Sequence, residues 1–310
     1  MTMLNENEIT DIFNIEKESL NYTNNLYKNG SYGVAYSLLN YVGEDPEKSC
    51  LTCPIEHGLL ISGQQMVAEE SINCSNYIIT NSLHSEKRIE KVSEKKVIKI
   101  GPYIEYATSV IAEHELQKLK ELYGRTLLVF PTHGIKGYGP QFSIEIFIEE
   151  IERVRKSFDT VLVCMYFYDI LCNHHKPYEK MNYIIVCAGN ESNKFFLNKL
   201  KTIICLSDAV ISNAYTTGLQ YAIHMKKPVY IVNGLDLLFV QEENSFNNID
   251  KLDEDVREWN KLKDFYSMCV DSSFGSLSLQ RKWGNDVFGL DQIKSRQDMK
   301  KLLAPVIRRF

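Results

Sequence analysis

Several features that mark particular protein classes are missing from this 310-residue sequence. No apolar run approaches the roughly 20 residues that a helix needs to cross a membrane. The first residues, MTMLNENEITDIF, lack the basic stretch and apolar core of a signal peptide. There is no long basic segment either, and the formal net charge is −5, so we expect no nucleic-acid partner. These absences predict a cytoplasmic protein.

Sequence motifs of several enzyme classes are missing as well. G-x-G-x-x-G does not occur and the glycines are too sparse for a P-loop, so neither a dinucleotide enzyme nor a kinase is expected. No G-x-S-x-G elbow marks a serine hydrolase. Most of the eight cysteines lie in apolar runs, where a free thiol packs as a small apolar side chain. Cys50-x-x-Cys53 has no second such pair, and Cys172, His174 and His175 lie in a polar loop, so we expect neither a metal nor a cofactor.

Short apolar runs recur from Cys50 to Val232 and have the length of buried strands. Runs that are apolar throughout are typical of parallel sheets covered on both faces. Stretches with helical spacing lie between them, for example residues 144–154 and 196–204. This alternation predicts an α/β fold of two Rossmann-like domains, with parallel sheets and helices on both faces. The expected strands are 50–55, 76–80, 96–100, 126–130, 160–167, 182–188, 208–212 and 228–232.

The length of the chain favours two domains. Gly101-Pro102 follows a predicted strand and a helical stretch precedes the next one, which places the hinge between residues 101 and 125. We therefore expect an N-terminal α/β domain at 1–105 and a C-terminal α/β domain with terminal helices at 106–310.

Apolar residues recur between Ile293 and Ile307, and they predict that the last of these helices includes both of these residues. Two roles remain open for this helix. It could pack on the junction between the domains, or its basic residues could contact a membrane surface. The basic residues are Lys300, Lys301, Arg308 and Arg309.

Polar clusters follow four of the predicted strands. Open parallel sheets bind their ligands beyond the carboxyl ends of the strands, so these clusters are the candidate site. They are Glu56 and His57 after 50–55, His133 after 126–130, Gly189 after 182–188, and Ser212 to Gly218 after 208–212.

The segment Ser-Asn-Ala-Tyr-Thr-Thr-Gly at 212–218 joins a predicted strand to a predicted helix. The first N–H groups of such a helix and its dipole face an anion, and the hydroxyls of Thr216 and Thr217 would add donors to phosphate oxygens. The alternative is that these threonines only cap the helix, a common role for threonine.

Two histidines occupy comparable positions after strands. His133 could donate a hydrogen bond to a donor phosphate, or it could be a structural histidine bonded to a carbonyl oxygen. His57 has the same setting in the first half of the chain, beside Glu56. Either residue of this pair could act as a base.

The stretch SDAVISNAYTTGLQYAIHMKKPVYIV resembles the donor-binding strand–loop–helix–strand of GT-B glycosyltransferases. The pairing of EHG with LLVFPTHG resembles capsule and teichoic-acid polymerising enzymes, including CDP-glycerol glycerophosphotransferases, and CMP-sugar-using transferases of surface polysaccharides. The resemblance extends over about residues 50–232. Gln220 departs from it, because many GT-B enzymes carry a glutamate there that holds the ribose.

The resemblance implies a metal-independent glycosyltransferase of capsule or lipopolysaccharide synthesis. It would move a sugar from a CMP-, CDP- or UDP-linked donor to a hydroxyl of a saccharide or lipid-linked saccharide acceptor. The domain at 1–105 would be the acceptor side, and the domain at 106–310 would bind the nucleotide donor. His57 would be the catalytic base, with Glu56 in reserve. Peripheral association with the membrane would follow from such an acceptor. The nucleotide and its phosphates would contact His133, Gly189, Ser212, Asn213, Tyr215, Thr216, Thr217 and Gln220.

Three other functions fit the same features. A CDP-alditol phosphotransferase would transfer a phosphate ester in place of a sugar. A nucleotide-sugar 2-epimerase would need the anion loop but no acceptor. A non-catalytic subunit could retain the fold and bind a sugar nucleotide without turning it over.

Overall fold

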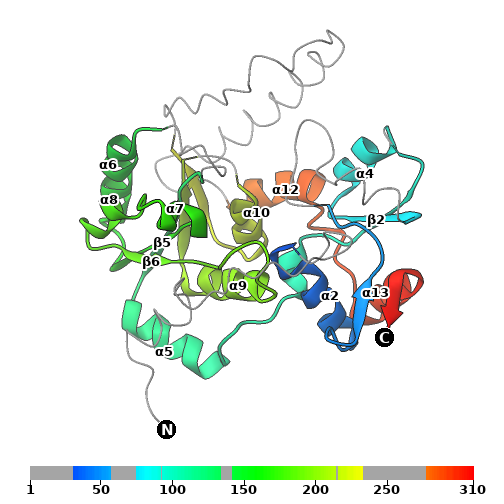
Figure 1. Cartoon of the computed structure of the whole chain (residues 1–310). Coiled ribbons are helices and arrows are strands. Elements are labelled where there is room, and N and C mark those ends of the chain that lie inside the picture. The colour runs from blue at the N-terminus through cyan, green and yellow to red at the C-terminus, as the bar shows by residue number, and fades with distance from the viewer. Residues whose placement is uncertain (1–30, 57–74, 92, 134–141, 214–215, 233–276) are drawn as a thin grey trace.

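The computed structural model describes residues 31–56, 75–91, 93–133, 142–213, 216–232 and 277–310. Strands and helices alternate along most of this part, and the protein is an α/β fold whose principal sheets are parallel (Figure 1). No helix among these residues is long and apolar enough to cross a membrane.

A five-stranded parallel sheet forms the centre of the second half, in the order β6-β5-β4-β7-β8. All five residues of β4 are buried, as a central strand covered on both faces requires. The predicted range 126–130 is therefore confirmed for this strand. The strands are β4 (Thr126–Phe130), β5 (Thr160–Cys164), β6 (Ile184–Val186), β7 (Ala209–Ser212) and β8 (Val229–Ile231).

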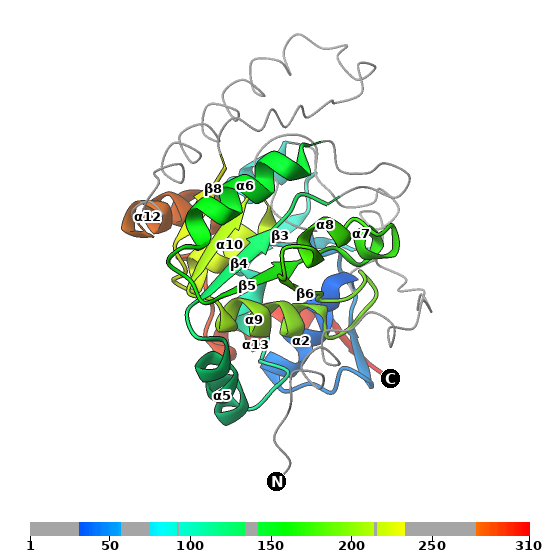
Figure 2. The same ribbon diagram turned by 90° about the vertical axis from the view of Figure 1, so that its left-hand side faces the viewer.

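The two faces of this sheet carry different helices, as Figure 2 shows. Leu127 and Val129 of β4 pack with Phe147 and Ile151 of α6 (Ile144–Arg155). The alternate residues, such as Leu128, belong to the core that contains α9 (Phe196–Leu206), α10 (Thr217–His224) and α5 (Glu113–Tyr123). This division follows from the two-residue period of a strand. Two short helices, α7 (Phe167–Leu171) and α8 (Lys176–Glu179), follow β5.

A smaller parallel pair stands beside the central sheet. β2 (Tyr77–Thr80) pairs with β3 (Lys96–Lys99), and Ile55 forms a parallel bridge to Ile79. α4 (Leu83–Glu90) connects the two strands, and the Ser82 hydroxyl accepts from the Ser85 N–H at its start. The 3₁₀ turns at Ser31–Gly33 and Tyr103–Tyr106, α2 (Val34–Val42) and α12 (Leu277–Phe288) complete this part.

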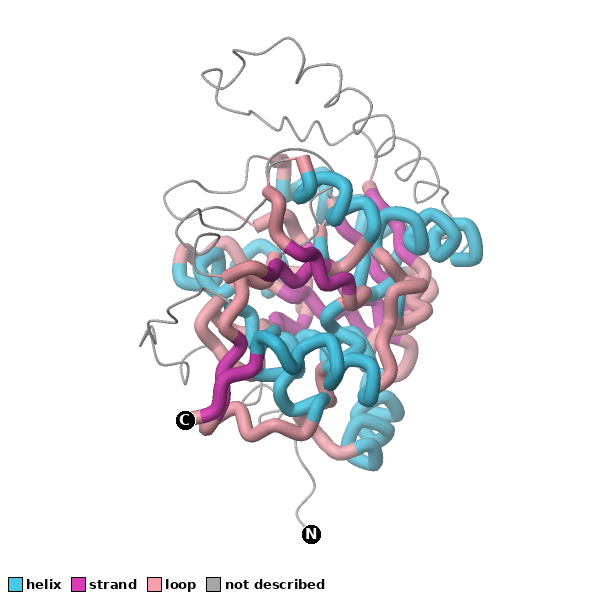
Figure 3. The backbone as a smooth tube through the Cα atoms, turned by 90° about the vertical axis from the view of Figure 1, so that its right-hand side faces the viewer, coloured by secondary structure: helices cyan, strands magenta, loops and turns pink. Residues whose placement is uncertain are grey.

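The end of the chain differs from the prediction. A helix through residue 307 was expected, but α13 (Arg296–Leu303) is followed by a 3₁₀ turn at Ala304–Val306 and by strand β9 (Ile307–Arg309). Pro305 lacks the N–H that a continuing helix needs, and the backbone then extends. β9 pairs antiparallel with β1 (Ser49–Leu51), beside the C-terminal label in Figure 3. The predicted parallel strand at 50–55 is therefore corrected to a short antiparallel strand followed by the bridge at Ile55.

Helix α2 was not predicted, because the first residues of the chain are polar. Its Leu38, Leu39 and Val42 are almost fully buried. They belong to one apolar core with residues of β2, α9 and α13, for example Ile79, Ile203, Met299 and Leu303. The division into domains at residues 105 and 106 remains a prediction.

Candidate functional site

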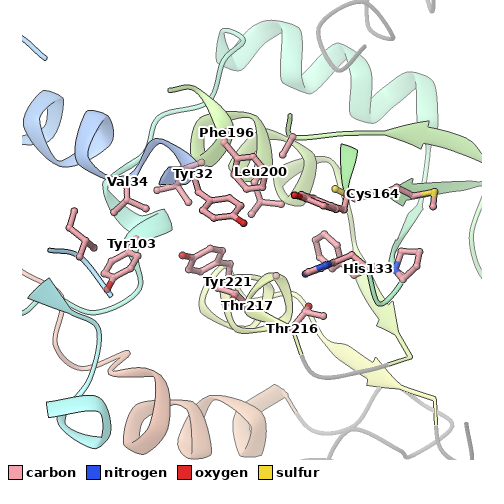
Figure 4. Close-up of a pocket in the computed structure, with 18 of the residues that line it drawn as sticks. Tyr32, Val34, Tyr103, His133, Cys164, Phe196, Leu200, Thr216, Thr217 and Tyr221 are labelled. Atoms are coloured by element: carbon pink, nitrogen blue, oxygen red, sulfur yellow. The ribbon is translucent and has the colours of Figure 1, made fainter. Parts of the chain in front are cut away.

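A pocket opens at the carboxyl ends of β4, β5 and β7, where the sheet rule predicts a ligand. It holds about 1120 Å³ of atom-free space, its open mouth included. Figure 4 shows residues of both halves of the chain facing one another across it. The lining includes Tyr32, Val34, Ile55, Glu56, Tyr103, Phe130, His133, Cys164, Tyr166, Ala188, Phe196, Leu200, Thr216, Thr217, Gly218 and Tyr221.

The first turn of α10 forms one wall of the pocket. Thr216 occupies the N-cap position with an extended backbone (φ −139°, ψ 157°), but its side chain makes no capping hydrogen bond. Its Oγ1 atom is buried and has no hydrogen-bond partner among the described residues. A Cβ on Gly218 would lie 3.0 Å from the ring of Phe130, so glycine permits the close packing of α10 on the end of β4. Of the two threonines that could cap the helix, Thr216 occupies the N-cap position, but its hydroxyl does not perform the capping role.

Asn213 joins the ends of β4 and β7. Its Oδ1 atom accepts hydrogen bonds from the Thr132 N–H (2.7 Å) and the Thr132 hydroxyl (3.0 Å). The Ser212 hydroxyl donates to the Phe130 carbonyl oxygen (2.6 Å). Both side chains are fully buried and lie outside the lining of the pocket. They hold the segment from which His133 projects.

His133 lies on the pocket side of that segment. Its ring packs against Tyr166, with 5.1 Å between the ring centroids and an angle of 44° between the planes. Tyr166 follows β5, so the two rings come from the ends of neighbouring strands. The lining therefore brings His133 and the start of α10 to the same pocket, as the sequence predicted.

Glu56 lines the pocket from the other half of the chain. Its carboxylate is fully buried, forms an ion pair with Arg88, and accepts a hydrogen bond from the Thr80 hydroxyl (2.6 Å). The Tyr103 hydroxyl donates to the Glu56 carbonyl oxygen (3.0 Å). Burial, together with the nearby Glu56 carboxylate, raises the pKa of Tyr103 well above its ordinary value, so this hydroxyl stays protonated. Both carboxylate oxygens of Glu56 are thus engaged.

Aromatic side chains dominate the inner part of the pocket. Tyr32 packs edge-on against Phe196, with ring centroids 4.8 Å apart. Tyr103 and Tyr221 face the same space from opposite halves of the chain (Figure 4). Large apolar surface with a few polar groups is typical of small-molecule sites.

The predicted site residues fall into three groups. Glu56, His133, Thr216 and Thr217 line the pocket together. His57 and Tyr215 lie outside the described residues. The remaining residues are buried and lie outside the lining of the pocket. Among them, the Gln220 amide nitrogen donates to the Phe288 carbonyl oxygen (3.4 Å), which turns this side chain away from the predicted ribose contact. This third group is Gly189, Ser212, Asn213 and Gln220.

The aromatic residues of the pocket were missed. Tyr221 could have been found from helical spacing, because it lies four residues after Thr217 and therefore on the same face of α10. Tyr166 lies inside the predicted strand 160–167, whereas β5 ends at Cys164, so its place beyond the end of the strand was not apparent from the sequence. Tyr32 gave no local signal, since it precedes the regular strand pattern.

Among the described residues, no group of three or more His, Cys, Asp or Glu side chains is arranged to hold a metal ion. His174 of the polar loop pairs with Asp169 through Nδ1 (3.1 Å).

No protein-family profile and no curated protein matches the sequence. Several solved structures resemble the fold at low identity. The wall teichoic acid polymerase TagF is 15% identical over 76% of this chain and 53% of its own, with a TM-score of 0.40. The S. aureus MnaA–UDP structure is 11% identical over 90% of this chain and 85% of its own (TM-score 0.37). WaaG, a glycosyltransferase involved in lipopolysaccharide biosynthesis, is 10% identical over 74% and 62% (TM-score 0.35). The chain spans about half the length of TagF.

Proposed function

We propose that this protein is a metal-independent glycosyltransferase that moves a sugar from a CMP-, CDP- or UDP-linked donor to a hydroxyl acceptor. The observation that carries the proposal is the buried Oγ1 atom of Thr216 at the start of α10, inside the pocket, which no residue in the described part of the chain meets with a hydrogen bond. The sequence resemblance to GT-B enzymes supports the choice of reaction and its place in bacterial surface-polysaccharide synthesis.

The start of α10 suits the phosphates of a nucleotide. The first N–H groups of a helix have no partner within the helix, and the helix dipole places partial positive charge at this end. A buried hydroxyl without a partner lowers stability by about 1–3 kcal/mol, and a phosphate oxygen that accepts its hydrogen bond would remove this cost. His133 lines the same pocket and would supply a further donor. These groups would stabilise the nucleotide as it leaves with its negative charge.

The other half of the chain would bind the acceptor. Glu56 and Tyr103 line the pocket from residues 1–105, the part assigned to an acceptor-side domain. Since both oxygens of Glu56 are already engaged, we assign the base to its neighbour His57. The acceptor would be a saccharide or a lipid-linked saccharide. Exposed Lys300 and Lys301 of α13 fit contact with an anionic membrane surface that carries such an acceptor.

Chelation of divalent metal should leave the activity intact, because the helix start and the hydroxyls perform the task of a cation. Turnover would be measured with and without EDTA, and with added magnesium or manganese. The sequence Asp253-Glu254-Asp255, outside the described residues, is a spacing that binds metal in other sugar transferases. Activity that is lost in EDTA, restored by metal and absent from D253N/D255N would make this enzyme metal-dependent.

Loss of the two hydroxyls at the start of α10 should weaken nucleotide binding more than it weakens the fold. A hydrogen bond to a charged group contributes about 1.5–3 kcal/mol, so T216A/T217A should raise the dissociation constant at least ~10-fold. A thermal-shift screen of CMP, CDP, UDP, GDP and ADP identifies the nucleotide, because a ligand of the folded state raises the melting temperature. Calorimetry then measures its affinity for wild type and variant.

Two controls separate phosphate binding from other effects. The matching nucleoside should bind both proteins equally, since it carries no phosphate. T160A removes a hydroxyl that donates to the Tyr123 carbonyl oxygen (2.6 Å) at the amino end of β5, and should leave nucleotide affinity unchanged. If T216A/T217A melts earlier but binds the nucleotide as tightly as wild type, the threonines are structural and the phosphates bind elsewhere.

A further inference from the structure

Tyr221 is a buried tyrosine whose hydroxyl has no visible task in the fold. The residue is 6% exposed and lies on the pocket side of α10. Its hydroxyl makes no hydrogen bond to any residue that the structure describes, and it points into the space between Tyr32 and Tyr103 (Figure 4). The Tyr103 hydroxyl, by contrast, donates to the Glu56 carbonyl oxygen.

The position of Tyr221 relative to the helix start suggests what it meets. Tyr221 lies four positions after Thr217, and this spacing corresponds to about 6 Å along the helix axis. In a nucleotide sugar the glycosyl group is bonded directly to the terminal phosphate. With that phosphate at the start of α10, the glycosyl group would lie one turn further along the same face.

The charges around this space favour an uncharged group. Among the described lining residues at this end, the carboxylate of Glu56 is the ionised side chain, and Arg88 already neutralises it. Burial raises the pKa of Tyr221 above its ordinary value, so its hydroxyl remains a neutral donor. An acidic sugar would place its carboxylate here with no cationic side chain for it among the described lining residues, and a buried unpaired charge is costly.

The aromatic walls fit the rest of a sugar ring. Tyr32 and Phe196 form an edge-on pair at one side, and Tyr103 stands at the other. Such surfaces cover the C–H groups of a sugar while a single hydroxyl fixes its orientation.

We infer that Tyr221 is a specificity-determining residue that binds a hydroxyl of an uncharged glycosyl group lying along α10. The inference rests on the proposed function, since it assumes a nucleotide-linked sugar with its phosphate at Thr216. Acidic sugars, such as a uronate or a nonulosonate, are then poor donors.

The test compares each nucleotide with its sugar conjugate. UDP, CDP, GDP and ADP and their glucose conjugates would be titrated into wild type and Y221F by calorimetry. The gain in affinity from the glucosyl group should fall about 3–10-fold in Y221F, the effect of one hydrogen bond between neutral groups. Affinity for the nucleotide alone should not change.

A matched control is Y178F. Tyr178 is 1% exposed, and its buried hydroxyl makes no hydrogen bond to the residues that the structure describes, but it lies outside the pocket. Both variants remove an unpartnered hydroxyl, so neither should lower the melting temperature. Y178F should leave the glucosyl gain at the wild-type value.

A separate comparison tests whether the glycosyl group must be uncharged. UDP-glucuronate differs from UDP-glucose by a carboxylate in place of a hydroxymethyl group, and should bind at least ~10-fold more weakly. Tighter binding of UDP-glucuronate than UDP-glucose, or of CMP-N-acetylneuraminate than CMP, would overturn the uncharged class. An unchanged glucosyl gain in Y221F, or no gain in wild type, would overturn the role of Tyr221 while nucleotide binding still supported the proposed function. Failure of every nucleotide and conjugate to bind would remove both.

Discussion

Replacing Arg88 by alanine should lower the free energy of unfolding by about 3–5 kcal/mol. The Glu56 carboxylate is fully buried and the Arg88 side chain is only 12% exposed. The substitution would leave a buried negative charge with the Thr80 hydroxyl as its remaining side-chain partner. Chemical denaturation at neutral pH measures this loss.

Two further variants distinguish the cost of an unpaired charge from a loss of packing. E56Q/R88M removes both charges and keeps similar volumes, so it should recover most of the lost stability. The Nε and Nη1 atoms of Arg88 are buried and have no hydrogen-bond partner within the described ranges, and their removal adds to this recovery. K48A breaks the exposed pair with Asp45 and should cost at most about 1 kcal/mol. An R88A protein no less stable than K48A would show that the Glu56–Arg88 pair does not hold the fold.

The central sheet was predictable from its sequence because its constraints are local. A strand buried on both faces is apolar along most of its length, and β4 is apolar from Leu127 to Phe130, with the polar Thr126 only at its start. Helix α6 repeats its apolar residues at helical spacing, and Phe147 and Ile151 are fully buried against the sheet.

The elements that depend on distant partners were not predictable in the same way. β1 and β9 are three residues each and pair Ser49 with Arg309 across almost the whole chain. Neither is long enough to show a strand period. The apolar face of α2 is short and follows a polar segment, so its role appears only when α9 and α13 pack beside it.

Some features of the candidate site were also predictable from the sequence, and others required the fold. Because strands of a parallel sheet end at one edge, their sequence positions alone brought His133 and Thr216 together. Gln220 and Tyr221 are neighbours in sequence, yet one bonds to the α12 end and the other lines the pocket. Successive helix residues point about 100° apart, and no sequence pattern states which face meets the ligand. The unpartnered hydroxyl of Thr216 likewise required the fold, since threonine before a helix usually caps it.

Replacing His57 by alanine should lower turnover by about 10²–10⁴-fold, the usual contribution of a general base. In the proposed reaction the acceptor hydroxyl must lose a proton as it attacks, and the base would come from the wall opposite the proposed site of the donor phosphates. Glu56 stands on that wall, but a carboxylate held by Arg88 and Thr80 would have to break one of these contacts to take the proton. His57 follows it directly in the sequence.

Separate measurements of binding and turnover decide between the two residues. H57A should bind the nucleotide as wild type does, because the phosphates meet the other wall, while its single-turnover rate falls. Rescue of that rate by added imidazole would assign the missing group as a base. E56Q should instead lose stability, since Arg88 then keeps its charge without a carboxylate partner. If H57A turns over normally and E56Q folds but does not, the proton goes to Glu56, and Arg88 must then move away from it during the reaction.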